Sequence, residues 1–561
     1  MTPREVPAEW LDRFFDDYYA DHPVNGTFIG VHDRDHELPD ASESALSGSL
    51  ARMRDRIESL PTGAAPGAES TDVRLAEGFL RLRSWELESG HFLRRNPSWY
   101  TGEAAFGVLS LFLSDFAPLS ARADAAEARI RAIPRLLEQA SANVRSAPRP
   151  WIDRALRECA SMRRFFDDGL QHIDAGEDGA LTPAQRSRLR TAADEATRHI
   201  NEHSVALESL SGEPVDAMPG IGEEAFDMHL RLAHGLTESA DEILRRAEDE
   251  IERVRALLPE RARALGAATP ADILQSLREV RPNADEYVAR YGAEWDRCRA
   301  FVQERDLLSW PDFPIEYVER PLWSRAAAPG LYFLFYRAPA TYGRPEPHRY
   351  LVAPLDRGAP QAEQEDFLRA NNDSVIRLNH VIHHGGVGHH VQNWHAYRAE
   401  SRVGRMAAVD CASRIAMHCG ATMAEGWACY ATDLMREMGA LTPAEEFAEM
   451  NGRIRMAART VVDIQLHRGR MSLAEAARYY QEVAGMPEGA AQGEATKNSM
   501  FPAAALIYFV GSDLIHQLRA TMTARPGWSL KRFHDEFLSY GSIPVALIGQ
   551  AMEARDDHAT V

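Results

Sequence analysis

The chain has 561 residues, of which 45% are hydrophobic and 26% are charged, as in a folded globular protein rather than a disordered one. Its formal net charge of −20 disfavours nucleic acid and anionic membrane surfaces as partners, because both are negatively charged. The first ten residues do not resemble a secretory signal, and no apolar stretch approaches the roughly 20 residues that span a bilayer. With only five cysteines in addition, we expect a cytoplasmic protein.

Helical periodicity dominates the N-terminal part of the chain. Apolar residues recur at helical spacing in four early segments, namely Trp10–Asp21, Asp72–Gly90, Arg122–Ser141 and Thr182–Leu210. The later segment Thr237–Leu258 is amphipathic, and Ser239 and Glu242 near its start have the spacing of a capping box. We therefore expect two helical parts, residues 1–215 and residues 216–561.

Strand signals are confined to one region. Short aromatic and β-branched runs lie at Ile315–Glu319, Leu331–Arg337 and Tyr350–Pro354, beside proline and glycine. The sequence therefore predicts a mainly α-helical fold with a small β element around residues 315–354.

Six of the 21 histidines fall within 16 residues that follow this β region, and they are His380, His383, His384, His389, His390 and His395. Neutral imidazole is the commonest protein ligand for zinc. A regular helix would hold His383 and His389 about 9 Å apart along its axis, too far to share one ion. Three glycines, at positions 385, 386 and 388, permit a break that could close this distance.

A candidate acidic ligand lies in the next helical segment. Glu425 follows His389 by 36 residues, on a helix that Gly439 could end. Two imidazoles and one carboxylate would leave a coordination position for water or substrate, which is the usual form of a catalytic zinc site.

These segments resemble the DUF885 family of bacterial, metallopeptidase-like proteins. Residues 388–392 read Gly-His-His-Val-Gln and residues 425–430 read Glu-Gly-Trp-Ala-Cys-Tyr, close to the family patterns H-E-x-x-P-G-H-H-x-Q and E-G-W-A-x-Y. Residues 321–332 and 501–511 resemble two further family stretches. The resemblance implies a two-lobed, metallopeptidase-like helical architecture with a cleft. It also implies a divalent metal on His383, His389 and Glu425.

The chain departs from the family pattern at its expected base. His384 stands where the family has the glutamate that moves protons in this class of metallopeptidase, and Val387 replaces a proline. Several polar positions of the family's C-terminal motif are apolar here. We therefore expect a specialised reaction, such as cyclisation, elimination or condensation in biosynthesis, with His384 as the proton shuttle. A metallopeptidase or amidohydrolase, and a non-catalytic binding protein, are the alternatives.

Several assignments remain open at this stage. His390 competes with His389 as a ligand or contacts the substrate, and His384 could instead be an additional ligand or belong to a silent site. Tyr430 and Tyr508 match family tyrosines that could donate to an oxyanion, or they could pack against neighbouring rings. His418 is expected to be structural, and the spacing of Cys411, Cys419 and Cys429 fits no zinc framework. Zinc is the first choice of metal and iron or another transition metal the second. The expected partner is a small-molecule or peptide-like substrate, and the oligomeric state is open.

Overall fold

The computed structural model describes residues 6–61, 67–173, 180–213, 220–312, 314–325, 327, 341–343, 347–407 and 414–559. It is 72% helical, and both of the sheets in these residues have two strands, so the predicted mainly α-helical fold is confirmed. The predicted segment Leu331–Arg337 lies outside the described residues.

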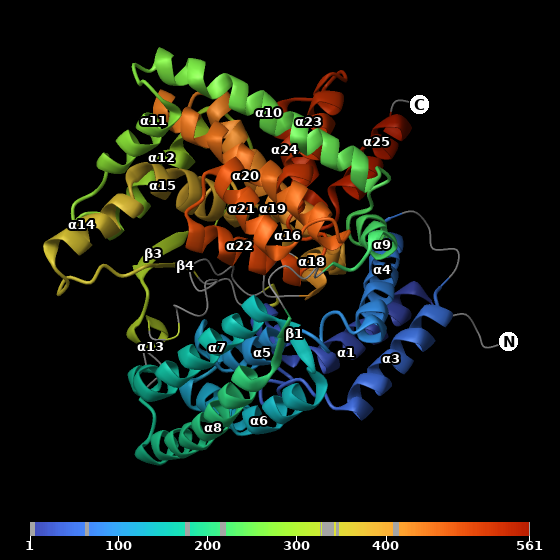
Figure 1. The fold of residues 1–561 in the computed structure, drawn as a ribbon. Coiled ribbons are helices and arrows are strands. Elements are labelled where there is room, and N and C mark those ends of the chain that lie inside the picture. The colour runs from blue at the N-terminus through green and yellow to red at the C-terminus, as the bar shows by residue number, and fades with distance from the viewer. Residues whose placement is uncertain are drawn as a thin grey trace.

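The first eight helices occupy the lower half of Figure 1 in blue and teal. They are α1 (Pro7–Asp21), α2 (Pro23–Ile29), α3 (Glu43–Glu58), α4 (Ala68–Ser89), α5 (Pro97–Leu109), α6 (Leu119–Asn143), α7 (Arg149–Arg164) and α8 (Pro183–Ser209). All four of the early helices expected from periodicity are present. Thr182 and Gln185 form the capping box at the start of α8, which satisfies backbone N–H groups that a helix end leaves without partners.

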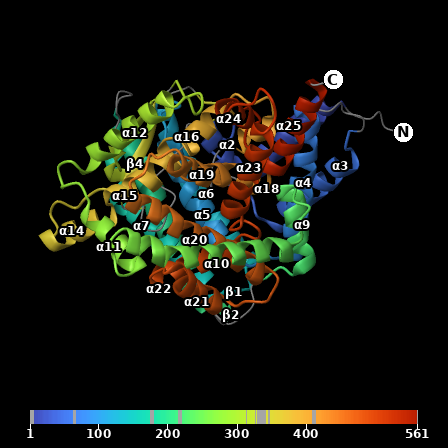
Figure 2. The same cartoon turned by 90° about the horizontal axis from the view of Figure 1, so that it is seen from above.

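Most of the later helices lie above this layer, whereas the short helix α13 (Leu322–Arg325) lies beside α7 (Figure 1). The later helices are α9 (Glu223–His234), α10 (Ala240–Ala264), α11 (Pro270–Glu279), α12 (Tyr287–Glu304), α13, α14 (Gln361–Ala370), α15 (Asp373–Val375), α16 (His389–Ala396), α17 (Arg402–Met406), α18 (Arg414–Cys419), α19 (Ala421–Glu437), α20 (Pro443–His467), α21 (Leu473–Ala484), α22 (Glu488–Met500), α23 (Ile507–Thr523), α24 (Leu530–Ser539) and α25 (Val545–Ala559). The expected capping box of Ser239 and Glu242 begins α10, which lies across α20 (Figure 2). Helix α4 contacts α9, α17 and α18 and so joins the two layers.

The hydrophobic core is continuous across the boundary expected near residue 215. One cluster of buried side chains runs from Trp10 to Met552, and a second, from Phe226 to Val510, lies among the later helices. The division into residues 1–215 and 216–561 stays a prediction.

Two short parallel strand pairs complete the fold. The expected strand Ile315–Glu319 (β3) pairs with β4 (His348–Val352), with Ile315 opposite His348. The other pair, β1 (Ser146–Pro148) and β2 (Ser211–Glu213), was not predicted, because three residues rich in serine, glycine and proline show no alternation. The β3–β4 pair matters for the site because Tyr350 Oη lies 2.5 Å from His380 Nδ1.

Candidate metal centre

The chain between His383 and His389 is not a regular α-helix. Residues Ile376–Gly385 form a π-helix, and α16 begins directly at His389. A π-helical segment is rare and widens the helix, often at functional sites. The backbone then folds back, so that the N–H of Gly388 donates to the carbonyl of Ile382 at 2.8 Å. The expected break between the two histidines is therefore present.

Glycine is required at the break because the backbone packs against itself. A Cβ atom on Gly388 would lie 1.8 Å from the carbonyl oxygen of His383, and one on Gly385 would lie 2.1 Å from Tyr317 Oη. Both distances are far inside van der Waals contact. Only residues without a side chain can bring the two ends of this segment so close.

Two indole groups hold the glycine segment in place. Trp295 Nε1 of α12 donates to the carbonyl of Gly385 at 2.7 Å, and Trp427 Nε1 of α19 donates to the carbonyl of Val387 at 2.8 Å. All four residues are buried, so these bonds are protected from water. Trp427 belongs to the Glu-Gly-Trp-Ala pattern, whereas the role of Trp295 could not be read from the sequence because it lies 90 residues before its partner.

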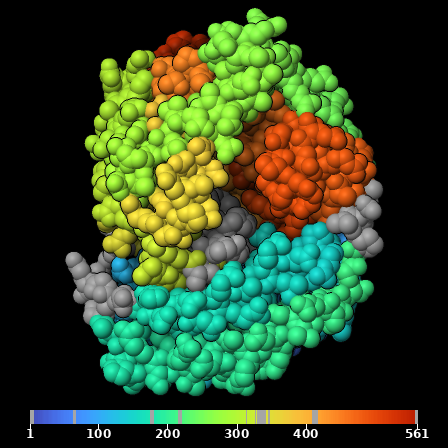
Figure 3. Space-filling model, turned by 60° about the vertical axis from the view of Figure 1, so that its left-hand side comes forward, coloured from blue at the N-terminus to red at the C-terminus, as the bar shows by residue number. Residues whose placement is uncertain are grey.

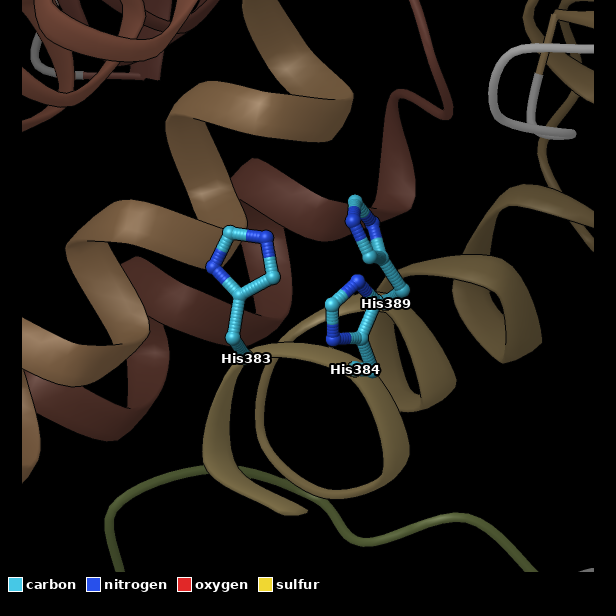
Figure 4. Close-up of side chains that lie close together, drawn as sticks. All are labelled: His383, His384 and His389. Carbon is cyan, nitrogen blue, oxygen red and sulfur yellow. The ribbon is translucent and has the colours of Figure 1, made fainter. Parts of the chain in front are cut away.

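The break gathers three histidines around one space (Figure 4). One side-chain nitrogen of each of His383, His384 and His389 can be chosen so that all three lie within 4.8 Å of one another. The ring centroids of His383 and His389 are 5.1 Å apart, and that of His384 lies 4.6 Å from His383. Within the described residues this is the group of potential ligands that meets the spacing for a shared ion.

Glu425 completes the group from α19. Its Oε2 lies 3.5 Å from His383 Nε2 and 3.7 Å from His389 Nε2. These separations exceed those of ordinary hydrogen bonds, which are about 2.7–3.2 Å. They are close to the roughly 3.3 Å that separates two ligand atoms placed tetrahedrally around zinc at about 2.05 Å. The separations of Glu425 from His383 and from His389 are therefore compatible with one shared divalent ion.

A close helix crossing places Glu425. Helices α19 and α23 meet at Gly426 and Gly511, where a Cβ atom on Gly511 would lie 2.2 Å from the carbonyl oxygen of Thr422. The crossing brings the start of α23, with Tyr508, beside Glu425, and both residues line one cavity.

The protonation states suit metal ligands. Burial lowers the pKa of His383 and lowers that of His384 further, helped by the neighbouring histidines. Burial alone would raise the pKa of Glu425, but His383, His389 and Lys497 outweigh it and hold the pKa well below its usual range. At neutral pH the carboxylate is ionised and the imidazoles of His383 and His384 carry lone pairs, as metal binding requires.

His384 has a defined tautomer. Its Nδ1 lies 2.6 Å from the backbone carbonyl oxygen of Asn379, so Nδ1 carries the hydrogen and donates it. The lone pair is then on Nε2. This arrangement is compatible with both roles considered for His384, proton transfer and ligation.

The structure places other histidines outside the group. His390 Nδ1 lies 3.5 Å from His348 Nδ1 and its ring stacks on that of His348, so the geometry favours His389 over His390 as the ligand. His380 contacts Tyr350, and His418 Nε2 lies 3.8 Å from a carboxylate oxygen of Glu86, where it is buried.

The two candidate tyrosines differ in position. The Tyr430 hydroxyl donates to His534 Nε2 at 2.7 Å and accepts from Arg519 at 3.1 Å, and its fully buried ring packs on Trp427. These contacts favour the packing role considered for it. Tyr508 is half-buried and lines the cavities on both sides of Glu425, so it remains a candidate for contact with a substrate.

Two cavities flank the site. One is lined by His383, Asn379 and residues of α19, α20 and α23, and its space is about 910 Å³ including open solvent at its mouth. The other is lined by Glu425, Lys497 and neighbours, and its space is about 680 Å³ on the same measure. Tyr508 belongs to both walls. Figure 3 shows the surface hollowed between the yellow stretch around α14 and the orange helices of the C-terminal half.

The cysteines do not join the metal group. Cys411 lies outside the described residues, Cys419 is buried with its thiol 3.8 Å from the carbonyl oxygen of Leu75, and Cys429 lines the larger cavity. Burial raises the pKa of both thiols, so they are protonated at neutral pH and are poor ligands.

The fold is that of a largely helical bacterial protein family. The chain belongs to the DUF885 family, described as "Bacterial protein of unknown function", whose model matches residues 23–552. This confirms the resemblance seen in the sequence motifs. The family description assigns no activity. No curated protein matches the chain.

Two solved structures share the fold over almost their whole length. The "putative lipoprotein of unknown function" from Shewanella oneidensis is 22% identical, with a TM-score of 0.75 over 98% of this chain and 100% of that one. The "putative lipoprotein" from Colwellia psychrerythraea is 16% identical, with a TM-score of 0.77 over 98% of this chain and 99% of that one.

These descriptions contradict the predicted location. Both solved structures are described as putative lipoproteins, so the cytoplasmic location expected from the sequence is wrong. That prediction depended on the cysteine number and on the first residues, and neither property reports where a protein of this fold resides. Within the described residues, none of the helices combines the length and apolar character needed to cross a bilayer.

Proposed function

We propose that this protein is a metal-dependent enzyme acting on a peptide-like or amino-acid-derived small molecule, with His383, His389 and Glu425 as the ligands of one divalent ion. The observation that carries the proposal is the position of Glu425 Oε2, 3.5 and 3.7 Å from the two imidazole nitrogens. Two histidines and a carboxylate are a common ligand set of catalytic zinc, with iron or another transition metal as the alternative. A bound ion would supply Lewis acidity toward a substrate carbonyl.

His384 supplies the proton transfer. Its Nδ1–H is held by the carbonyl of Asn379, so Nε2 is the atom that takes a proton from the substrate or returns it. A neutral imidazole base can move a proton in cyclisation, elimination or condensation, and it can also do so in hydrolysis. The larger cavity, with His383 in its wall, provides room for such a substrate.

Metal analysis tests the ligand set. The purified protein should contain about one equivalent of a transition metal per chain, and His383→Ala should lose most of it. His395→Ala is the matched control, because His395 lies on the same helix as His389 but outside the group of potential ligands. Full metal content in His383→Ala would overturn the assignment.

Turnover tests the enzyme class. The metal-loaded protein is incubated with a mixture of small peptides and N-acylated amino acids, and products are identified by mass spectrometry. Gain of one water indicates hydrolysis, and loss of water or ammonia indicates cyclisation, condensation or elimination. His384→Gln should retain metal and lose turnover, and retained turnover would exclude His384 as the base. Binding without conversion in the native protein would favour the non-catalytic alternative.

A further inference from the structure

The larger cavity carries a basic side chain with no ionic partner. Three arginines of α20 lie close together in the sequence, at positions 453, 455 and 459. Arg453 pairs with Asp433 at 2.7 Å and with Glu250 at 2.8 Å. Arg459 pairs with Glu494 at 2.7 Å. Arg455, which lines the cavity and keeps solvent contact, makes no ion pair or hydrogen bond with the described part of the chain.

Other exposed arginines, such as Arg261 on α10, also have no ion pair in the described residues. Arg455 differs from them because its side chain lines a cavity. Desolvation at the cavity wall and the charge of Arg459, one helical turn away, lower the pKa of Arg455. The nearby Glu494 acts in the opposite direction but does not outweigh them, and it pairs with Arg459. An anion bound beside the guanidinium would relieve this unfavourable environment.

The acidic residues in the same cavity do not offset Arg455. Asp433 accepts from Arg453, from His516 at 2.8 Å and from Ser512 at 3.1 Å. Glu449 lies 2.5 Å from Arg436, and burial together with Asp433 raises the pKa of Glu449 well above its usual range. The uncompensated charge of this wall is therefore positive.

Arg455 is placed to orient a substrate toward the metal centre. Its electrostatic neighbours include Cys429 and Tyr508. Cys429 follows Glu425 by one turn of α19, about 6 Å along the helix axis. Tyr508 lies in the wall that the two cavities share, and His383 opens into the same cavity as Arg455. A molecule the size of an amino acid derivative could thus contact both ends of this space.

We propose that Arg455 binds the carboxylate of the substrate, which makes the substrate class amino-acid-derived molecules with a free carboxylate. The inference rests on the proposed metal-dependent function. The planar guanidinium donates two parallel N–H bonds to a carboxylate, which fixes the orientation of the molecule as well as its charge. Arg455 is thus a residue that determines specificity.

Binding measurements on the full-length, metal-loaded protein test this inference. The probes are N-acetyl-L-leucine and its uncharged amide, measured by calorimetry. The acid should bind the native protein at least about tenfold more tightly than the amide. Arg455→Gln should remove this preference, and Arg455→Lys should restore only part of it because a lysine cannot donate in a fork. Arg261→Gln, on the exposed surface of α10, is the matched control and should keep the preference.

Each outcome has a defined meaning. Equal binding of acid and amide, no binding of the acid, or an unchanged preference in Arg455→Gln overturns the role of Arg455. Inorganic phosphate that binds more tightly than the acid, through Arg455, overturns the carboxylate assignment in favour of a phosphate ligand. Metal analysis of the same samples distinguishes failure of the proposed function from failure of this inference. Absence of metal refutes the proposed function, whereas full metal content without an acid preference refutes only this inference.

Discussion

Replacement of Gly388 by alanine should destabilise the protein and empty its metal centre. The added Cβ would lie 1.8 Å from the carbonyl oxygen of His383, 2.6 Å from its carbonyl carbon and 2.9 Å from the carbonyl oxygen of Ile382. All three atoms are backbone, so no side chain can rotate away. Overpacking in a core costs about 1–3 kcal/mol when side chains can adjust, and here we expect about 3 kcal/mol or more.

The assay combines denaturant unfolding with metal analysis. Gly388→Ala should unfold at a lower denaturant concentration and lose most of its bound metal, because His383 and His389 are separated by the same movement. Gly292→Ala is the control, since nothing lies within 4 Å of its added Cβ in the middle of α12. That variant should be neutral or more stable by up to about 1 kcal/mol. If Gly388→Ala retained native stability and metal content, the explanation of the break would be refuted.

Three further predictions concern the surroundings of the site. Trp427→Phe removes the N–H that donates to the carbonyl of Val387. It should lower the free energy of unfolding by about 1–3 kcal/mol and weaken metal retention during dialysis against a chelator. Unchanged retention would contradict the role of this bond in holding the glycine segment. Tyr430→Phe should lower stability by about 1–2 kcal/mol with no effect on metal content or on KM, and a large change in turnover would restore it as a catalytic candidate. Burial lowers the pKa of His534 to about 4, below the value of 6.5 in the unfolded chain. The contribution of neutral His534 to the stability of the folded state is therefore complete above about pH 6.5 and is lost as the pH falls toward 4. The denaturation midpoint should therefore fall over this range, and less steeply in His534→Asn; identical slopes would rule out this contribution.

Much of the molecule follows from local properties of the sequence. The helices expected from apolar periodicity are present, and the capping box expected at Ser239 begins α10, because both signals act within one or two turns. The Gly-His-His and Glu-Gly-Trp-Ala patterns identified the family for the same reason, since each is a short segment in which backbone geometry and side-chain chemistry are specified together.

Other features depend on segments that are distant in the sequence. Spacing could not separate His389 from His390, because a break in the helix changes which face each residue occupies, and only the bonds from Trp295 and Trp427 define that break. Tyr430 fits its motif equally well in either role, and its orientation depends on His534, 104 residues away.

The role proposed for Arg455 also could not be predicted from the sequence. In the sequence Arg455 is one of three arginines on an amphipathic helix, and nothing distinguishes it from Arg453 or Arg459. What separates them is ion pairing, because Glu250, Asp433 and Glu494 from other helices pair with Arg453 and Arg459. Periodicity thus determined the helices, and short motifs determined the family and the residue types of the site. Tertiary packing decided which of those residues converge, because electrostatic and hydrogen-bonding partners are set by distance in space and not by separation along the chain.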